Sequence, residues 1–444
     1  MQKRLTHILI GAALSGSAVA GCSSAPDGSN DTINVLMVDN PQMSDLKILA
    51  NDFTRTTGIK VNFTVLPENQ VGDVASKEFS TQAGKYDVTS ISNFEVPYYA
   101  ERGWLEPLGR YIEQDAQFDQ EDILRPIAAS PTARDGLVYA EPFYGESSFL
   151  MYRQDILAEA GIRMRPTPTW QEVADIAERV DGARPGMRGI CLRGLPGWGE
   201  MIAPLTTVVN TFGGTWFTKD WQASVDSAEF TEATKFYVDL IKKHGELDPE
   251  RAGYSECLDS VLKGKVAMWY DSTAAAGQLE AEGSQVRSLM GYVPAPVMQP
   301  KASGWLYTWA WGIEKAGTRK DLAWKFVSWS SSKHYEDLVG ATLGWEKVPA
   351  GKRESTYSNP QYLSSAGSFA QQTELAILSA EPKNPGMQPR PTIGIQFVDI
   401  PEFVDLGNKV SQDLSKVLTG DMKVGEVLAA GQELAQSVAV KYRK

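Results

Sequence analysis

The sequence contains few of the side chains on which most catalytic and metal sites depend. Among its 444 residues there are three histidines and three cysteines. His7 lies near the N-terminus, and His244 and His334 lie outside any motif for a Ser-His-Asp or Cys-His arrangement. There is also no phosphate-binding loop ending in Gly-Lys-Ser/Thr, no GxGxxG after a predicted strand and no HExxH. We therefore expect no catalytic residue, no bound metal and no cofactor.

Positive charge and long apolar runs are also scarce. The formal net charge is −12, from 43 Lys and Arg against 55 Asp and Glu. An acidic surface repels phosphates, so we expect neither nucleic acid nor an anionic membrane surface as a partner. Beyond the N-terminal region, no stretch approaches the ~18 uninterrupted apolar residues of a transmembrane helix. The composition, 42% hydrophobic and 22% charged, is typical of a globular protein, and the length favours two lobes.

The N-terminus has the pattern of an export signal. Two basic residues at positions 3 and 4 precede an apolar run over 5–20 that is too short for a membrane span. The run ends in Val-Ala-Gly-Cys22, which resembles a bacterial lipobox, and this resemblance implies cleavage before Cys22 and a lipid on its sulfur. We predict a signal peptide over 1–21, a flexible tether over 22–30 and a lipid anchor at the outer face of the bacterial cytoplasmic membrane. A soluble exported protein with a stray cysteine is the alternative.

The two other cysteines, Cys191 and Cys257, would lie in an oxidising compartment after export. A disulfide between them and two separate buried thiols are equally compatible with their spacing. Neither belongs to a CxxC or Cys/His metal pattern. Their pairing therefore stays open on the sequence alone.

Strands and helices alternate through the first hundred residues. A short apolar run at 33–38 suits a buried strand. Ser44 is placed to cap a following helix, and Gly58 to end it. Alternating apolar residues at 59–65 predict a second strand, and we expect a third at 87–91 after a polar, helical connection. This alternation is typical of a parallel sheet with helices on its faces, where ligands bind beyond the carboxyl ends of the strands.

The alternation resumes in the middle of the chain. Thr169 and Glu172 form a capping-box pattern at the start of a helix. We expect short strands at 189–193 and 266–270 and a helix over 228–244. Two more amphipathic helices are predicted near the C-terminus. Together these patterns predict a second α/β lobe.

Residues 138–152 combine strand-forming ends with Pro142 and Gly145 in the middle. Proline and glycine inside a strand indicate a kink, a bulge or an edge. We interpret this segment as a crossing between the lobes that places Tyr144 and Glu146 where the lobes meet. A bent core strand with an incidental acid is the alternative.

Aromatic residues lie beside carboxylates at the ends of several predicted strands. Carboxylates accept charge-assisted hydrogen bonds from hydroxyl groups, and aromatic faces cover the C–H surface of a sugar or polyol. Arg390 is a candidate donor to the same ligand. Glu95 and Glu200 are also compatible with solvated acids, and the aromatic face of a predicted strand over 305–313 with core packing. The candidates from this pattern are Phe94, Glu95, Tyr144, Glu146, Trp198, Glu200, Trp269, Asp271 and Trp305.

Several segments resemble one family. Residues 262–269, Leu-Lys-Gly-Lys-Val-Ala-Met-Trp, and 152–155, Tyr-Arg-Gln-Asp, resemble extracellular solute-binding proteins of ABC importers, in the carbohydrate group related to maltose-binding protein. The match covers nearly all of the chain after the predicted leader. A narrower resemblance to sorbitol- and mannitol-binding proteins is carried by residues 142–148, 189–194, 197–200 and 388–391.

The resemblance implies a two-lobed α/β fold of the type II periplasmic-binding-protein class, with a mixed sheet flanked by helices in each lobe. The implied lobes are residues 31–140 with 301–350 and residues 141–300 with 351–444, joined by hinges near 140–146, 297–304 and 350. By position, the family's ligand site falls on Asn40, Glu68, Phe94, Glu95, Tyr144, Glu146, Trp198, Trp269, Asp271, Trp305 and Arg390.

The implied function is capture of a linear polyol, of the sorbitol or mannitol type, by hinge closure, followed by delivery to the transmembrane subunits of an ABC permease. We expect a monomer that changes no bond in its ligand and is therefore not an enzyme. A binding protein for a mono- or oligosaccharide is the alternative of the same class. A secreted glycoside hydrolase that uses two of these acids is an alternative of another class, although no enzyme motif supports it.

Overall fold

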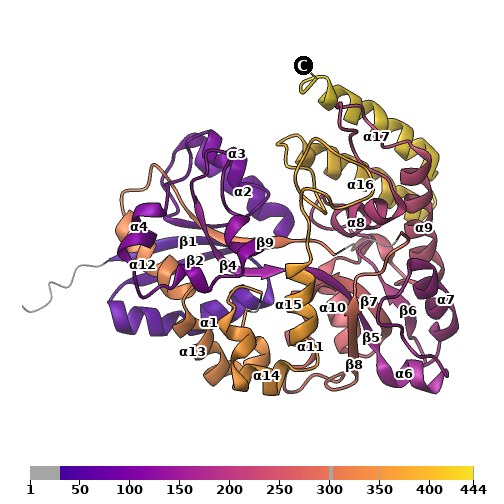
Figure 1. Cartoon of the computed structure of the whole chain (residues 1–444), viewed down its shortest axis with the longest axis horizontal. Helices are drawn as coiled ribbons and strands as arrows, with labels where there is room; N and C mark the ends of the chain where they lie inside the picture. The colour runs from indigo at the N-terminus through magenta and orange to yellow at the C-terminus, as the bar shows by residue number, and fades with distance from the viewer. Residues whose placement is uncertain (1–30, 300–303, 350, 444) are drawn as a thin grey trace, which may run out of the picture.

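The structure, a computed structural model, describes residues 31–299, 304–349 and 351–443. The predicted signal peptide, the tether and Cys22 lie outside these residues. Figure 1 shows two lobes side by side with strands and a connecting segment between them. Within the described ranges, no helix has both the length and the apolar composition needed to cross a membrane.

The first lobe is built on a five-stranded mixed sheet in the order β2-β1-β3-β9-β4. β1 (Thr32–Val38) pairs in parallel with β2 (Lys60–Leu66) and β3 (Val88–Ser92). β9 (Tyr307–Ile313) runs antiparallel between β3 and β4 (Ala140–Glu146). The strands predicted in the first hundred residues are confirmed to within a residue or two.

The second lobe is built on a four-stranded mixed sheet in the order β6-β7-β5-β8. β6 (Arg188–Cys191) is parallel to β7 (Val266–Ser272). β5 (Ser148–Arg153) runs antiparallel to both β7 and β8 (Met290–Pro294). Both strands that the sequence predicts here are confirmed, and both sheets are mixed as expected.

Helices flank both sheets (Figure 1). Those around the first sheet are α1 (Pro41–Thr57), α2 (Glu68–Thr81), α3 (Val96–Glu101), α4 (Gly109–Gln114), α5 (Arg125–Ala129), α12 (Lys320–Ser330) and α13 (Lys333–Leu343). Those around the second are α6 (Gln154–Glu159), α7 (Trp170–Val180), α8 (Ile202–Phe212), α9 (Ala228–His244), α10 (Tyr254–Leu262), α11 (Ala276–Leu279), α16 (Phe403–Thr419) and α17 (Val424–Ala439). α14 (Pro360–Ala366) and α15 (Ala370–Leu378) lie near the junction of the lobes.

Helix α1 begins about one turn earlier than the sequence analysis expects. Asn40, not Ser44, is the N-cap, and its side-chain oxygen accepts a hydrogen bond of 3.0 Å from the Met43 N–H. Ser44 was the wrong cap because the apolar period starts late, whereas Pro41 at the first helical position is the true start signal. Gly58 ends the helix with φ 76°, as predicted. The cap fixes Asn40 directly beyond the carboxyl end of β1.

The segment over 138–152 forms two strands in different sheets. β4 pairs with β9 in the first lobe, and its register shifts between Pro142 and Tyr144, which confirms the predicted bulge. β5 pairs with β7 and β8 in the second lobe. Ser147 alone separates the two strands. The chain therefore passes from one sheet to the other at Ser147, next to Glu146.

Two local features stabilise the second lobe. The predicted capping box is confirmed, since the Glu172 N–H donates to Thr169 Oγ1 at 3.2 Å and the Thr169 N–H donates to Glu172 Oε2 at 2.8 Å. A disulfide joins Cys191 at the end of β6 to Cys257 in α10, with their Cα atoms 5.8 Å apart. It fastens the start of α10 beside the loop that follows β6.

The aromatic face of β9 divides between cleft and core. Tyr307 and Trp309 line cavities between the lobes. Trp311 is fully buried and packs between Phe143 and Phe326, with ring centroids 5.3 and 5.7 Å away. Both interpretations of this aromatic strand therefore apply, each to one half of it.

Candidate ligand-binding cleft

Two adjoining cavities lie between the lobes. The larger pocket has a volume of about 240 Å³ and the smaller pocket one of about 50 Å³. Both are lined by Glu68, Trp198, Gly199, Tyr307 and Trp309. Because Glu68 starts α2 directly after β2, the cleft lies at the carboxyl ends of the parallel strands, where the topology of such sheets predicts a ligand.

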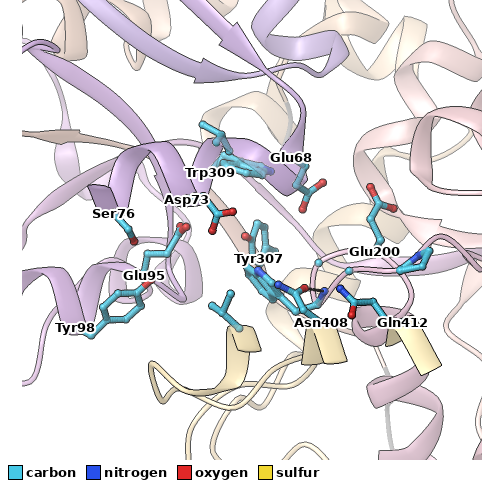
Figure 2. A pocket seen from close by; sticks show the side chains of 17 residues that line it. Glu68, Asp73, Ser76, Glu95, Tyr98, Glu200, Tyr307, Trp309, Asn408 and Gln412 are labelled. Atoms are coloured by element: carbon cyan, nitrogen blue, oxygen red, sulfur yellow. Dashed lines mark hydrogen bonds between the residues drawn. The ribbon is translucent and has the colours of Figure 1, made fainter. Parts of the chain in front are cut away.

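Acids, amides and rings from both lobes line the cavities. Beyond the shared residues, the larger pocket is lined by Val71, Gly72, Asp73, Ser76, Glu95, Tyr98, Pro196, Gly197, Glu200, Val404, Asn408 and Gln412. The smaller pocket is lined by Asn40, Gln42, Tyr144, Glu146, Arg193, Ala203, Tyr254, Ser272, Ala274, Trp305 and Gln396. Figure 2 shows Glu68, Asp73 and Glu95 on one side of the larger pocket and Glu200, Asn408 and Gln412 on the other.

The structure brings most of the predicted site residues to this cleft. Asn40, Glu68 and Glu95 follow β1, β2 and β3, and Glu146 ends β4. Those that line one or both pockets are Asn40, Glu68, Glu95, Tyr144, Glu146, Trp198 and Trp305, together with Glu200 from the pattern of acids and rings. Those that do not line either pocket are Phe94, Trp269, Asp271 and Arg390.

Glu68 and Glu200 approach each other across the cleft from different lobes (Figure 2). Burial, and then the charge of Glu200, raises the pKa of Glu68 to about 8, against the opposing effect of Arg193. Burial also raises the pKa of Glu200. Glu68 also lies against the residue before Glu200, because a Cβ atom on Gly199 would be 2.8 Å from Glu68 Oε1. Both pKa shifts favour the neutral form of these two carboxyl groups.

Glu146 lies at the crossing between the lobes. Its Oε2 accepts a hydrogen bond of 2.6 Å from Ser272 Oγ at the end of β7. Burial raises the pKa of Glu146 to about 7, although the Ser272 hydroxyl and Arg193 favour the charged form. This hydrogen bond joins Glu146, at the end of a strand of the first sheet, to Ser272, at the end of a strand of the second sheet.

Asp271 is turned away from the cleft and is an ion-pair partner instead. It is fully buried and accepts from Arg193 through both oxygens, at 2.8 Å from Nε and 2.6 Å from Nη2. Trp269 Nε1 donates to the same carboxylate at 3.1 Å. The guanidinium carbon of Arg193 lies 5.2 Å from the centroid of the Tyr254 ring, which lines the smaller pocket. Asp271, which also accepts from Trp269, thus fixes Arg193 in the wall of the smaller pocket.

Phe94 and Arg390 also act from behind the wall. Phe94 is 1% exposed, and its ring lies 4.6 Å from that of Trp198. Arg390 Nη2 donates to Asn210 Oδ1 at 2.8 Å. Asn210 Nδ2 in turn donates to the Ile395 carbonyl at 2.7 Å. Phe94 thus packs on a pocket residue, whereas Arg390 is linked through Asn210 to Ile395, the neighbour of the pocket residue Gln396.

Several pocket residues are absent from the sequence-based set. Arg193 lies in a segment that carries the family resemblance, and Tyr307 on the aromatic strand, so each had a signal. Tyr254 and Gln396 had none, because they come from a helix start and a long connection far from the predicted strand ends. Only the tertiary fold brings them to the cleft.

In the smaller pocket, several side-chain N–H donors are already used in hydrogen bonds within the protein. Asn40 Nδ2 donates to Tyr144 Oη at 3.1 Å, and Gln42 Nε2 to the Ala274 carbonyl at 3.1 Å. The Arg193 donors are engaged by Asp271, Glu200 and the Gly199 carbonyl. The acids add acceptors. The arrangement suits an uncharged ligand rich in hydroxyl donors, with C–H surface for the rings. Among the residues that the structure describes, no group of His, Cys, Asp and Glu is arranged to hold a metal ion.

Comparisons with known proteins agree with this architecture. Residues 39–336 match the sequence profile of the bacterial extracellular solute-binding proteins. A mannitol-binding protein of Pseudomonas aeruginosa is 35% identical over 411 residues, covering 91% of this chain and 92% of the relative.

Solved structures give the same result for the fold. A solute-binding protein of an ABC transporter from Agrobacterium vitis, with bound D-mannitol, is 37% identical with a TM-score of 0.90, covering 93% of this chain and 99% of that chain. Maltose-bound MalE3 of T. maritima has a TM-score of 0.76 at 19% identity, covering 92% and 99%. The two-lobed type II fold predicted from the sequence is thereby confirmed. The profile spans more than half of the chain, so this protein belongs to the bacterial extracellular solute-binding proteins of ABC transporters, a family of transport receptors and not of enzymes.

Proposed function

We propose that this chain captures a linear polyol, of the mannitol or sorbitol type, and delivers it to an ABC permease. The observation that carries the proposal is the cleft, where Glu68, Glu146 and Glu200 from both lobes face a space walled by Trp198 and Trp309. A polyol offers a hydroxyl donor on every carbon, carries no charge and presents C–H edges to rings. The mannitol-binding relative and the D-mannitol complex support the same ligand class.

The proposed ligand contacts are the predicted residues that line the pockets: Asn40, Glu68, Glu95, Tyr144, Glu146, Trp198 and Trp305. To these we add Glu200, which the sequence pattern also indicates, and Arg193, Tyr254, Tyr307 and Trp309. Phe94, Trp269, Asp271 and Arg390 are proposed to position them. This division predicts that substitutions in the first group change affinity directly.

The proposed mechanism is closure of two lobes about the crossing segments. The pairing of β4 with β9 favours a first boundary at Ser147, so residues 141–146 move with the first lobe. The other crossings remain as proposed, near 297–304 and 350. A ligand that contacts both lobes favours the closed state by its higher affinity for it.

Membership in an extracellular family implies export, and an ABC transporter implies a permease as partner. We further propose the signal peptide over 1–21, the tether over 22–30, lipid on Cys22 and a monomeric state. Globomycin treatment of expressing cells would test the anchor, because a lipoprotein precursor accumulates and a non-lipoprotein is processed normally.

Calorimetric titration with a ligand panel tests the function. D-mannitol, D-sorbitol and ribitol should include at least one ligand with 1:1 binding, and maltose, maltotriose and D-glucose should bind much more weakly. Binding of a disaccharide without any polyol would overturn the proposal.

A further inference from the structure

One residue of the smaller pocket, Gln396, comes from a long connection between two helices. Gln396 lies in the connection over 379–402 between α15 and α16, which we call the strap. Figure 1 shows the connection from α15 to α16 running past the junction of the lobes. The Gln396 side chain lines the smaller pocket beside Tyr144, Glu146 and Trp305 and is 3% exposed.

The orientation of the Gln396 amide is determined by one hydrogen bond. Its Nε2 donates to the Leu306 carbonyl at 3.0 Å. A carbonyl only accepts, so the NH₂ end must face Leu306 and the oxygen must point the other way. That oxygen, Oε1, is buried and has no hydrogen-bond partner among the described residues. A buried acceptor without a hydrogen-bond partner is destabilising. A hydrogen-bond donor on a ligand would supply the missing partner.

The strap is held so that this oxygen stays in place. The Ile395 carbonyl accepts from Asn210 Nδ2 at 2.7 Å, and Asn210 is fixed in turn by Arg390. On the other side of Gln396, the Phe397 ring lies 5.1 Å from that of Phe94 in the first lobe. Asn210 belongs to α8 of the second lobe, so the strap is hydrogen-bonded to the second lobe there, and it is both hydrogen-bonded to the first lobe at Leu306 and packed on it at Phe94.

A glycine shapes the strap before Gln396. Gly394 has φ 114°, a conformation that side chains rarely adopt, and a Cβ atom there would lie 2.7 Å from the Phe397 ring. The turn at Gly394 therefore brings Phe397 back over the chain. Residue 396 is then directed at the cleft.

We infer that Gln396 is a specificity-determining residue whose Oε1 accepts a hydrogen bond from one hydroxyl of the ligand. This inference rests on the proposed function, because it assigns part of the polyol's recognition to one oxygen. The ligand must offer a donor at that place. An analogue with hydrogen there leaves the acceptor unpaired and is selected against.

A ligand-by-protein cycle tests the assignment. D-mannitol is two-fold symmetric, so its 1,6-, 2,5- and 3,4-dideoxy analogues, which keep this symmetry, remove each kind of hydroxyl in both orientations of the ligand. In the wild-type protein, one analogue should bind about tenfold or more weakly than D-mannitol because it leaves the Gln396 oxygen unpaired. In Gln396→Met, D-mannitol should bind about five- to tenfold more weakly and that same analogue should lose its disadvantage.

The matched control is Gln361→Met, an exposed glutamine of α14 outside both pockets, which should leave D-mannitol affinity unchanged. Gln396→Asn, which withdraws the oxygen, is a second variant should Gln396→Met fail to fold. D-mannitol binding with unchanged affinity in both Gln396 variants, or an undiminished deoxy penalty in them, overturns the inference and leaves the proposed function intact. Absence of deoxy discrimination in the wild-type protein also overturns it. Failure of the wild-type protein to bind any polyol overturns the proposed function itself.

Discussion

Arg193, in the wall of the smaller pocket, and Asp271, behind it, form a two-pronged ion pair, with Nε and Nη2 of the arginine 2.8 and 2.6 Å from the two carboxylate oxygens. The Arg193 side chain is 6% exposed and that of Asp271 is 0% exposed. The pair determines where the only arginine of the smaller pocket lies, within the described residues. It therefore links the stability of the second lobe to the geometry of the cleft.

Asp271→Ala should destabilise the fold as well as weaken binding. It leaves the buried Arg193 without its main partner, and removing one side of a buried pair costs about 3–5 kcal/mol. Urea unfolding of the ligand-free protein measures this. Asp259→Ala is the control, since its pair with Lys263 is more than half exposed and should contribute less than about 1 kcal/mol. Equal, small losses in the two variants would contradict the structural role of Asp271.

Glu146→Ala should weaken polyol binding by about 1–3 kcal/mol, the effect of losing a charged hydrogen-bond partner. The reason is its place at the crossing, where it lines the smaller pocket and accepts from Ser272. Calorimetry gives the affinity, and thermal unfolding shows whether the fold is intact. Glu101→Ala, at an exposed acid paired with Arg134, is the control and should bind as the wild type does. A Glu146 variant with wild-type affinity would remove this residue from the site.

Polyol affinity should fall as the pH rises from about 6 to 9. Glu68, with a pKa of about 8, and Glu200, with a raised pKa, come from different lobes, so their repulsion acts when the cleft is closed. The closed cleft then binds more protons than the open one, and acid favours closure by up to about tenfold per pH unit for each proton. The charged groups that act on Glu68 are Glu200, Arg193, Glu146 and Asp271.

Glu68→Gln removes one member of this pair and should flatten the pH profile, whatever its effect on absolute affinity. Calorimetry at several pH values, in buffers of different ionisation enthalpy, also counts the protons taken up. A wild-type affinity independent of pH across this window would contradict the coupling.

Arg390→Met should weaken polyol binding about fivefold by loosening the hydrogen-bonded chain through Asn210 to Ile395, next to Gln396. The loss should not add to that of Gln396→Met, because both act through the same oxygen. A calorimetric double-mutant cycle measures the coupling. Additive losses would show that Arg390 acts independently of Gln396.

The strands of both sheets, and the pocket residues that directly follow strands, could be predicted from the sequence for the same physical reason. Asn40, Glu68 and Glu95 follow three strands in the chain, so local periodicity and the rule for parallel sheets suffice to place them together. The same local pattern predicted Asp271 as a site residue. It could not include the distant ion-pair partner that determines where this side chain lies. A carboxylate at a strand end turns toward its strongest partner, and Arg193 is 78 residues away in the sequence.

Gln396 and Tyr254 show the other limit of sequence reasoning. Neither follows a strand, and neither has a neighbour whose pattern indicates a ligand. Gln396 reaches the smaller pocket through the turn at Gly394 and its bond to Leu306, which are tertiary relationships. The cap of α1 was missed for a smaller reason, since Pro41 outweighs the late start of the apolar period.

Titration of D-mannitol into the wild-type protein, followed in parallel by small-angle scattering, tests the central claim most directly. Acids and rings from two lobes should hold one polyol per chain, with micromolar or tighter affinity, and the radius of gyration should decrease as the lobes close. Binding of maltose in place of every polyol, or polyol binding with no change in the closure of the lobes, would contradict the account.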